Sequence, residues 1–134
     1  MNALVNAKII MEHEVLDNHT VIYDSQIRGI LPREQIVPAD MQCIDAQGLY
    51  LSPGFIDIHK HGAYDYDTMD ANDNQAIKML EKLPETGVTG LYPTTMSMAF
   101  SDIRKAMESI QRLMGAKYTG TRVLGCHMEG PFLS

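Results

Sequence analysis

The 134-residue sequence contains few cysteines and no long apolar run, and both absences restrict its class. Cys43 and Cys126 lie far apart and lack a metal-binding spacing, so we expect two free, buried thiols and no disulfide framework. No run of about 18 apolar residues occurs, so no segment is expected to span a membrane. The amino terminus lacks the basic leader and apolar core of a secretory signal. These absences favour a reducing cytoplasm as the location.

The sequence also lacks an excess of positive charge. Its formal net charge is −6, and no stripe of Lys and Arg is present, so neither nucleic acid nor an anionic membrane is expected as a partner. No glycine-rich phosphate loop, Gly-x-Ser-x-Gly elbow or Cys-x-x-Cys pair occurs. Mechanisms based on a phosphate loop or a serine nucleophile therefore have no supporting motif.

Residues 1–52 are typical of a small, mostly antiparallel β module. No helical apolar period occurs there, and turn residues separate short β segments. The likeliest turns are 17–19 and 46–48, which contain Asn18 and Gly48. The expected strands are Leu4–Met11, Thr20–Tyr23, Gln26–Leu31 and Met41–Ile44.

Residues 53–134 instead alternate apolar runs with helical patterns, which indicates parallel βα units. Asp70 or Asn72 is placed to cap the first helix, and Gly87 to end it. The expected elements are a strand at Phe55–His61, a helix at Asp73–Glu85, a strand at Val88–Thr95, a helix from Ser101 to about Gly115, and a strand at Arg122–Glu129.

Three parallel strands with two helices leave a sheet edge and apolar faces uncovered. A closed (β/α)₈ barrel typically needs about 250 residues. The expected fold class is therefore α/β, with the first three strands of an incomplete (β/α)₈ barrel following the β module. We expect these 134 residues to be the front part of a longer protein.

The strongest chemical signal is a His-x-His pair at the end of the first parallel strand. Side chains alternate along a strand, so His59 and His61 point to one side and Lys60 to the other. By the same alternation, Glu129 at the end of the third strand shares its side with His127, a candidate supporting group. Barrel enzymes build their sites at the carboxyl ends of strands, and two histidines with one carboxylate suit catalytic zinc.

Each of these residues also has an ordinary interpretation. A His pair at a strand end is often no more than polar surface, and a single glutamate such as Glu129 is more often solvated or paired with a cation. Thr94 and Thr95 either line the site or simply reflect the β preference of threonine. The joint placement of His59, His61 and Glu129 is what favours a metal site.

Four stretches then resemble a known family. Leu51–Gly62 is similar to the first barrel strand of the amidohydrolase superfamily, which includes hydantoinases, dihydroorotases and deacetylases. Asp67–Asp70, Gly87–Thr95 and Gly125–Leu133 narrow the resemblance to N-acetylglucosamine-6-phosphate deacetylases. The last stretch, which includes His-Met-Glu-Gly-Pro-Phe, is the most discriminating, and the similarity covers nearly the whole chain.

The resemblance implies a hydrolase that removes acetate from an amino-sugar phosphate, a small-molecule partner, and gives glucosamine 6-phosphate. It implies one or two divalent ions, with zinc favoured over iron, manganese or cobalt. The resemblance implies that Glu129 is a metal ligand, because it matches a glutamate with that role in the family. His59 and His61 match histidines that hold a second ion in some members. A homodimer is expected for the longer protein.

No catalytic residue is assigned within the chain. The resemblance puts the proton-shuttling aspartate and two further histidine ligands beyond Ser134, so the 134 residues alone are not expected to turn over substrate. A hydantoinase or dihydroorotase is the first alternative, although those enzymes usually use a carboxylated lysine, and Glu129 within Glu-Gly-Pro argues against one. The second alternative is a non-catalytic assembly or metal-binding module whose open edge is covered by a partner or a second copy.

Overall fold

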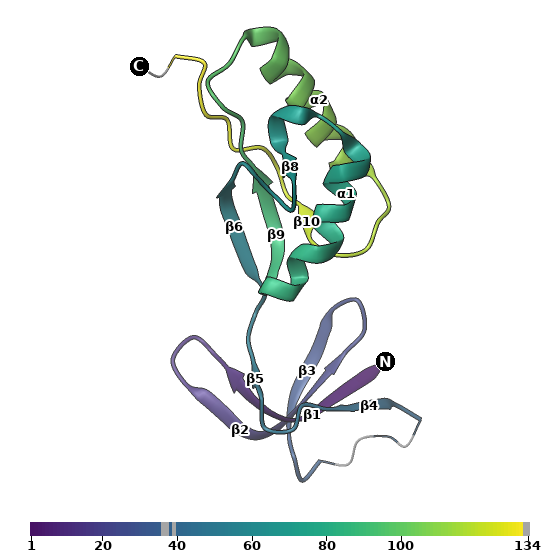
Figure 1. The fold of residues 1–134 in the computed structure, drawn as a ribbon. Helices are drawn as coiled ribbons and strands as arrows, with labels where there is room; N and C mark the ends of the chain where they lie inside the picture. The colour runs from purple at the N-terminus through teal and green to yellow at the C-terminus, as the bar shows by residue number, and fades with distance from the viewer. Residues whose placement is uncertain (36–37, 39, 133–134) are drawn as a thin grey trace. The chain divides into compact units, whose positions relative to one another are not determined.

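A computed structural model describes residues 1–35, 38 and 40–132 of the chain, so Leu133 at the end of the discriminating motif lies outside the described residues. The chain divides into two compact units, which meet between Pro53 and Gly54 (Figure 1). In the described part of the chain, the first unit is built from strands alone and the second from strands and helices. Each unit has a hydrophobic core of its own.

The amino-terminal unit is a five-stranded sheet in which β1 is central. Strands β1, β2 and β3 pair in antiparallel fashion, whereas the short β4 and β5 run parallel to β1. Ala7, Ile9 and Val21 form the centre of the core of this unit. The strands are β1 (Asn2–Ile10), β2 (Val15–Tyr23), β3 (Ile27–Pro32), β4 (Gln42–Asp45) and β5 (Tyr50–Leu51).

The turn expected at residues 17–19 is wrong, because these residues lie inside β2. The pairing of β1 with β2 shifts register twice, and each shift contains an asparagine with positive φ, Asn6 at 57° and Asn18 at 59°. Asparagine tolerates this conformation, so it serves here in β-bulges rather than in a turn. The expected turn at 46–48 is confirmed, since Leu49 N–H donates to the Ala46 carbonyl at 2.9 Å.

The second unit contains a three-stranded parallel sheet of order β10-β9-β6. A small antiparallel hairpin, β7 with β8, follows the first strand directly. The elements are β6 (Phe55–Lys60), β7 (Gly62–Ala63), β8 (Tyr66–Asp67), η1 (Thr68–Asp70), α1 (Asp73–Lys82), η2 (Leu83–Thr86), β9 (Val88–Pro93), α2 (Phe100–Gly115) and β10 (Arg122–Val123).

The two long helices pack together against the sheet (Figure 1). Leu80 of α1, Leu91 of β9, Ile110 of α2 and Val123 of β10 belong to one buried cluster. The Asn72 side chain caps α1 by accepting from the Gln75 N–H group at 3.3 Å, as one of the two expected caps. This packing holds β9, and β9 in turn pairs with β6; the candidate site lies at the carboxyl ends of these two strands.

The third expected strand is much shorter than the sequence indicated. Instead of Arg122–Glu129, the structure has β10 at Arg122–Val123 and an isolated bridge between Thr94 and His127. Pro93 of β9 has no N–H group, so it cannot donate to the ladder at the point where the strand would continue. Pairing resumes beyond it, where His127 N–H donates to the Pro93 carbonyl at 3.0 Å.

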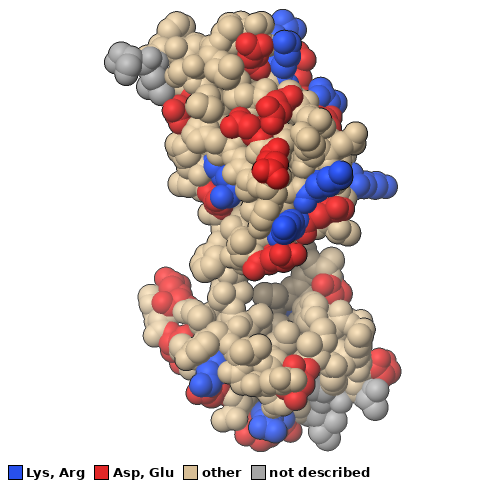
Figure 2. Space-filling view, viewed as in Figure 1, with Lys and Arg blue, Asp and Glu red and all other residues tan. Residues whose placement is uncertain are grey.

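The surface carries charges of both signs. On the face drawn in Figure 2, Lys and Arg side chains lie among Asp and Glu side chains and do not form a basic stripe. Both cysteines are free, but Cys43 is exposed, so the expected burial of that thiol is wrong. Within the described residues, no helix is long and apolar enough to cross a membrane.

Candidate metal centre

The structure brings His59, His61 and Glu129 together at one point. Nε2 of His59 lies 3.2 Å from Nε2 of His61, and each of these nitrogens lies 3.4 Å from Oε2 of Glu129. The three atoms form a nearly equilateral triangle. Among the described residues, this is the group of three or more His, Cys, Asp and Glu side chains whose ligand atoms could share a metal ion.

Thr94 fixes the part of the triangle that comes from β6. Its hydroxyl accepts the Lys60 N–H group at 2.9 Å, and its own N–H donates to the Lys60 carbonyl at 2.9 Å. Thr94 is fully buried, so these bonds are shielded from water. Lys60 lies between the two histidines in sequence, and holding its backbone holds both imidazoles at the strand end.

Thr95 fixes the glutamate in a similar way. Its Oγ1 accepts the Glu129 N–H group at 3.0 Å and donates to the Glu129 carbonyl at 3.1 Å. The Thr95 N–H group also donates to the His127 carbonyl at 3.1 Å, and the residue is fully buried. Two adjacent threonines at the end of β9 therefore position the two halves of the triangle, a role that the sequence pattern left open.

Gly130 allows the chain to turn immediately after Glu129. Its φ is +83°, and a Cβ built there would lie 2.6 Å from Oγ and 2.8 Å from Cα of Ser97. A side chain at position 130 would therefore push the Glu129 segment away from residue 97. The close approach of these two backbone segments explains why the glutamate is followed by glycine.

His127 supports the site without joining the triangle. Its Nδ1–H group donates to the Ile58 carbonyl at 2.7 Å, and its ring centroid lies 4.7 Å from that of His59 in an edge-to-face arrangement. His127 also lines, with His59 and Glu129, a pocket of about 340 Å³. These contacts place His127 beside the triangle, and its expected supporting role stays a prediction.

The neighbouring charged and sulfur groups do not enter the triangle. Nζ of Lys60 pairs with Oδ2 of Asp57 at 3.1 Å. Burial raises the pKa of the Cys126 thiol, so that sulfur stays protonated at neutral pH. The donors at the site are therefore imidazole and carboxylate.

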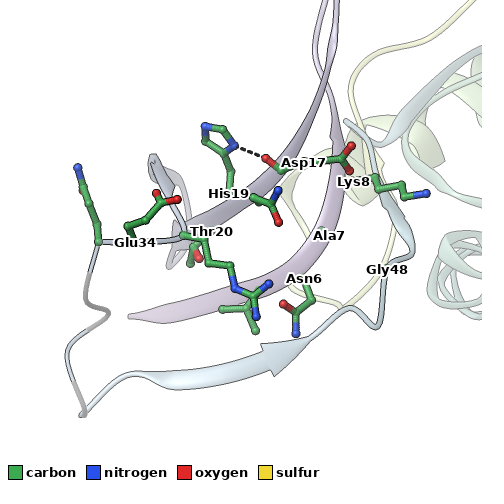
Figure 3. Close-up of a pocket in the computed structure, with 12 residues that line it drawn as sticks. Asn6, Ala7, Lys8, Asp17, His19, Thr20, Glu34 and Gly48 are labelled. Carbon is green, nitrogen blue, oxygen red and sulfur yellow. Dashed lines mark hydrogen bonds between the residues drawn. The ribbon is translucent and has the colours of Figure 1, made fainter.

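A second pocket, of about 530 Å³, lies within the amino-terminal unit (Figure 3). Lys8, Asp17, His19 and Glu34 contribute side chains of both signs to its lining. Nδ1–H of His19 donates to the Asp17 carbonyl at 2.7 Å, so that ring nitrogen is already paired. His19 is half-buried, whereas His13, elsewhere in the same unit, is exposed. Among the described residues that line this pocket, no set of ligand atoms converges on one point.

Comparison with known proteins finds relatives and solved structures that are named as deacetylases. The chain is related over nearly its whole length to the amino-terminal third of N-acetylglucosamine-6-phosphate deacetylases. It is 35% identical over 130 residues to the enzyme of that name from Bacillus subtilis (strain 168), with 94% of this chain and 33% of that protein covered. No family model matches the chain.

Two further comparisons extend this result. The chain is 30% identical over 128 residues to N-acetylgalactosamine-6-phosphate deacetylase from Escherichia coli O157:H7, covering 95% of the chain and 32% of that protein. The crystal structure of N-acetylglucosamine-6-phosphate deacetylase from Pasteurella multocida matches with a TM-score of 0.81 and 33% identity, over 99% of this chain and 35% of that one. The chain thus spans about a third of the length of the relatives it matches.

Proposed function

We propose that the chain is the amino-terminal part of a metal-dependent deacetylase acting on N-acetylglucosamine 6-phosphate. In this proposal, residues 1–52 form the β module, residues 53–134 begin a (β/α)₈ barrel, and His59, His61 and Glu129 bind a divalent cation. The observation that carries it is the triangle of two imidazoles and one carboxylate within a chain related to deacetylases of this name.

The donor spacing supports a small tetrahedral ion. Bonds of about 2.0–2.1 Å to nitrogen and oxygen place two tetrahedral ligands about 3.3–3.4 Å apart. The three distances between donor atoms are 3.2, 3.4 and 3.4 Å. Imidazole and carboxylate donors suit zinc, iron, manganese and cobalt, and zinc is favoured because it accepts two histidines and one carboxylate with one open position.

The donor set also has a suitable charge. Two neutral imidazoles and the Glu129 carboxylate leave about one positive charge of a divalent cation uncompensated. A cation at such a site polarises an amide carbonyl and makes water more acidic. Within the chain, His59 and His61 supply neutral nitrogen donors, and the buried threonines at 94 and 95 hold the donors still.

Zinc titration of the 134-residue chain tests the ligand set. We expect saturable binding that is weakened in His59→Asn and in Glu129→Gln by more than the roughly 10- to 100-fold typical of losing a supporting partner. His13→Asn, an exposed histidine of the other unit, is the matched control and should bind like the wild type. Equal zinc affinity in all four proteins would refute the proposed ligands.

We expect deacetylase activity only from a longer polypeptide that contains these 134 residues. We expect that polypeptide to release acetate from N-acetylglucosamine 6-phosphate, and we expect the 134 residues alone not to do so, because the resemblance puts the proton-shuttling aspartate beyond Ser134. Acetate release by the 134-residue chain at a comparable rate would contradict the second expectation. Dihydroorotate serves as the control substrate for the sister-enzyme alternative.

A second substrate is favoured by one relative. The Escherichia coli protein named above is an N-acetylgalactosamine-6-phosphate deacetylase, and galactosamine differs from glucosamine only in the configuration at C4. Both sugars present the same amide to the metal centre. The kcat/KM values for the two sugar phosphates should therefore be compared directly, and the larger value identifies the substrate.

A further inference from the structure

Thr68 faces His61 across the hairpin formed by β7 and β8. Strands β7 and β8 pair Gly62 with Asp67 and Ala63 with Tyr66. The next pair in this antiparallel register is His61 with Thr68. The Thr68 N–H group donates to the His61 carbonyl at 2.6 Å, so the two residues face each other just beyond the ends of the hairpin strands, where η1 begins.

Opposite residues in an antiparallel pair put their side chains on the same face, with Cβ atoms about 4.5–5.5 Å apart. The Thr68 hydroxyl and the His61 ring therefore occupy neighbouring space. Thr68 is 1% exposed. Among the described residues, the buried side-chain nitrogen and oxygen atoms that lack a hydrogen-bond partner are Nδ1 of His61 and Oγ1 of Thr68.

Buried polar atoms are almost always hydrogen-bonded, and two unpaired ones on residues that face each other at the open end of a hairpin are natural partners. An imidazole that offers Nε2 to a cation carries its proton on Nδ1, and that N–H group needs an acceptor. Nε2 of His61 faces His59 and Glu129, so its Nδ1 is the atom left to be satisfied. A threonine hydroxyl is a suitable acceptor.

We propose that Thr68 is a positioning residue for the metal centre: its hydroxyl accepts the Nδ1–H group of His61 through one buried water, and so fixes the tautomer that presents Nε2 to the cation. This inference rests on the proposed function, because it assigns a purpose to the Nε2 lone pair. It adds to the site a residue that touches no donor atom of the triangle.

The backbone around Thr68 is built to hold this position. Asp67 caps the 3₁₀ turn η1, since its Oδ1 accepts the Met69 N–H group at 2.8 Å while Oδ2 of Asp70 accepts the Asp67 N–H group at 2.9 Å. A Cβ at Gly62 would lie 1.9 Å from the Tyr66 carbonyl oxygen, so the hairpin is closely packed. The location of Thr68 opposite His61 is therefore fixed by contacts on both sides.

The test compares Thr68→Val, which removes the hydroxyl, with Thr68→Ser, which keeps it. Zinc affinity is measured by competition with a chromophoric chelator. We expect T68V to bind zinc roughly 10- to 100-fold more weakly than the wild type, as for other losses of an outer partner, and T68S to stay within about threefold. Thr20→Val, a buried threonine of the amino-terminal unit, is the matched control and should bind like the wild type.

A second readout does not depend on metal. Long-range ¹H–¹⁵N spectra of the metal-free protein report which nitrogen of neutral His61 carries the proton. We expect the Nδ1–H tautomer in the wild type and in T68S, and a mixture in T68V. A wild-type His61 protonated on Nε2 would overturn the proposal, as would zinc binding by folded T68V equal to that of the wild type.

The two readouts also separate this proposal from the proposed function. If the wild-type chain bound no zinc, or if His59→Asn bound it equally well, the metal site would be refuted. The tautomer of His61 and its response to T68V would still decide the role of Thr68. A T68V protein that failed to fold would leave the decision to T68S and to the wild-type tautomer.

Discussion

At the scale of single residues, the candidate site depends on side chains that hold the donors rather than on the donors alone. Thr95 makes two hydrogen bonds to the backbone of Glu129, and Thr94 makes the corresponding contacts with Lys60. Both threonines are fully buried. Small changes at these positions should therefore alter the geometry of the site, although neither threonine hydrogen-bonds to a donor atom of the triangle.

Replacing Thr95 with valine should loosen Glu129. The substitution keeps the shape of the side chain but leaves the Glu129 N–H group without its partner, which should cost about 1–3 kcal/mol in the free energy of unfolding. Zinc affinity should fall as well, because the carboxylate is no longer held. Urea unfolding and zinc titration measure the two effects, and exposed Thr119→Val is the control that should change neither.

Replacing Gly130 with alanine should be more damaging than its size suggests. The residue has φ of +83° and no room beside Ser97, so we expect a loss of at least about 1–2 kcal/mol in stability and weaker zinc binding. Gly115→Ala is the matched control, since a Cβ there meets nothing within 4 Å and alanine favours the helix. If both variants unfolded at the same urea concentration, the close approach at position 130 would carry no cost.

At the scale of secondary-structure elements, one ion-pair cluster ties the start of α1 to α2. The Asp73 carboxylate accepts hydrogen bonds from Nε of Arg112 at 2.7 Å and from Oγ of Ser109 at 2.5 Å. The Arg112 guanidinium, followed by the Ser109 hydroxyl, holds the pKa of Asp73 below its usual range, although burial opposes this. The cluster therefore favours the charged carboxylate in the folded state.

This gives stability a defined dependence on pH. A carboxyl group with a lowered pKa in the folded state contributes stability above its unfolded pKa of about 3.9, and that contribution is lost as pH falls through the folded value. The midpoint of urea unfolding should thus fall with acid, and the fall should be smaller in Asp73→Asn. Asp102→Asn, at an exposed pair within α2, is the control, and an unchanged acid profile in D73N would contradict the assignment.

The helices were more predictable from the sequence than the ends of the strands. The expected helix at 73–85 begins at Asp73, and Pro84 explains why its last turn becomes the 3₁₀ segment η2. Helix caps and apolar periodicity are local, so one segment reveals them. The third strand was overestimated because the missing donor of Pro93 affects a partner strand that is distant in sequence.

The candidate site shows the same limit. Alternation along one strand was enough to expect the convergence of His59 and His61. The roles of Thr68 and Thr95 depend on the register between segments, which no local pattern encodes. Their metal-binding context stays a prediction until zinc titration tests it.

At the scale of the whole molecule, the described part of the second unit leaves one edge of its sheet without a neighbouring strand. Among the described residues, strand β6 pairs with β9 and with no other strand, and Phe55, Ile56 and Ile58 are 66%, 58% and 64% exposed. An edge strand with adjacent exposed apolar side chains is a template for association with other chains. The isolated 134 residues should therefore tend to self-associate through this strand.

Light scattering over a range of protein concentrations measures this tendency. We expect the apparent mass of the 134-residue chain to rise above that of a monomer as concentration increases, and the rise to be reduced in the double variant Ile56→Thr, Ile58→Thr. Ile27→Thr removes an equally exposed isoleucine from the amino-terminal unit and should leave the behaviour unchanged. A wild-type chain that stays monomeric throughout would contradict the role of β6.

The closure of the triangle by a segment distant from β6 has a thermodynamic consequence. Its donors come together only when β6, the end of β9 and the segment containing Glu129 are all in place, whereas an unfolded chain offers no such arrangement. Zinc should accordingly shift the calorimetric transition of the unit that begins at Gly54 to higher temperature, by an amount that grows with the logarithm of free zinc. The amino-terminal sheet, which contributes no donor, should melt at the same temperature with or without the ion.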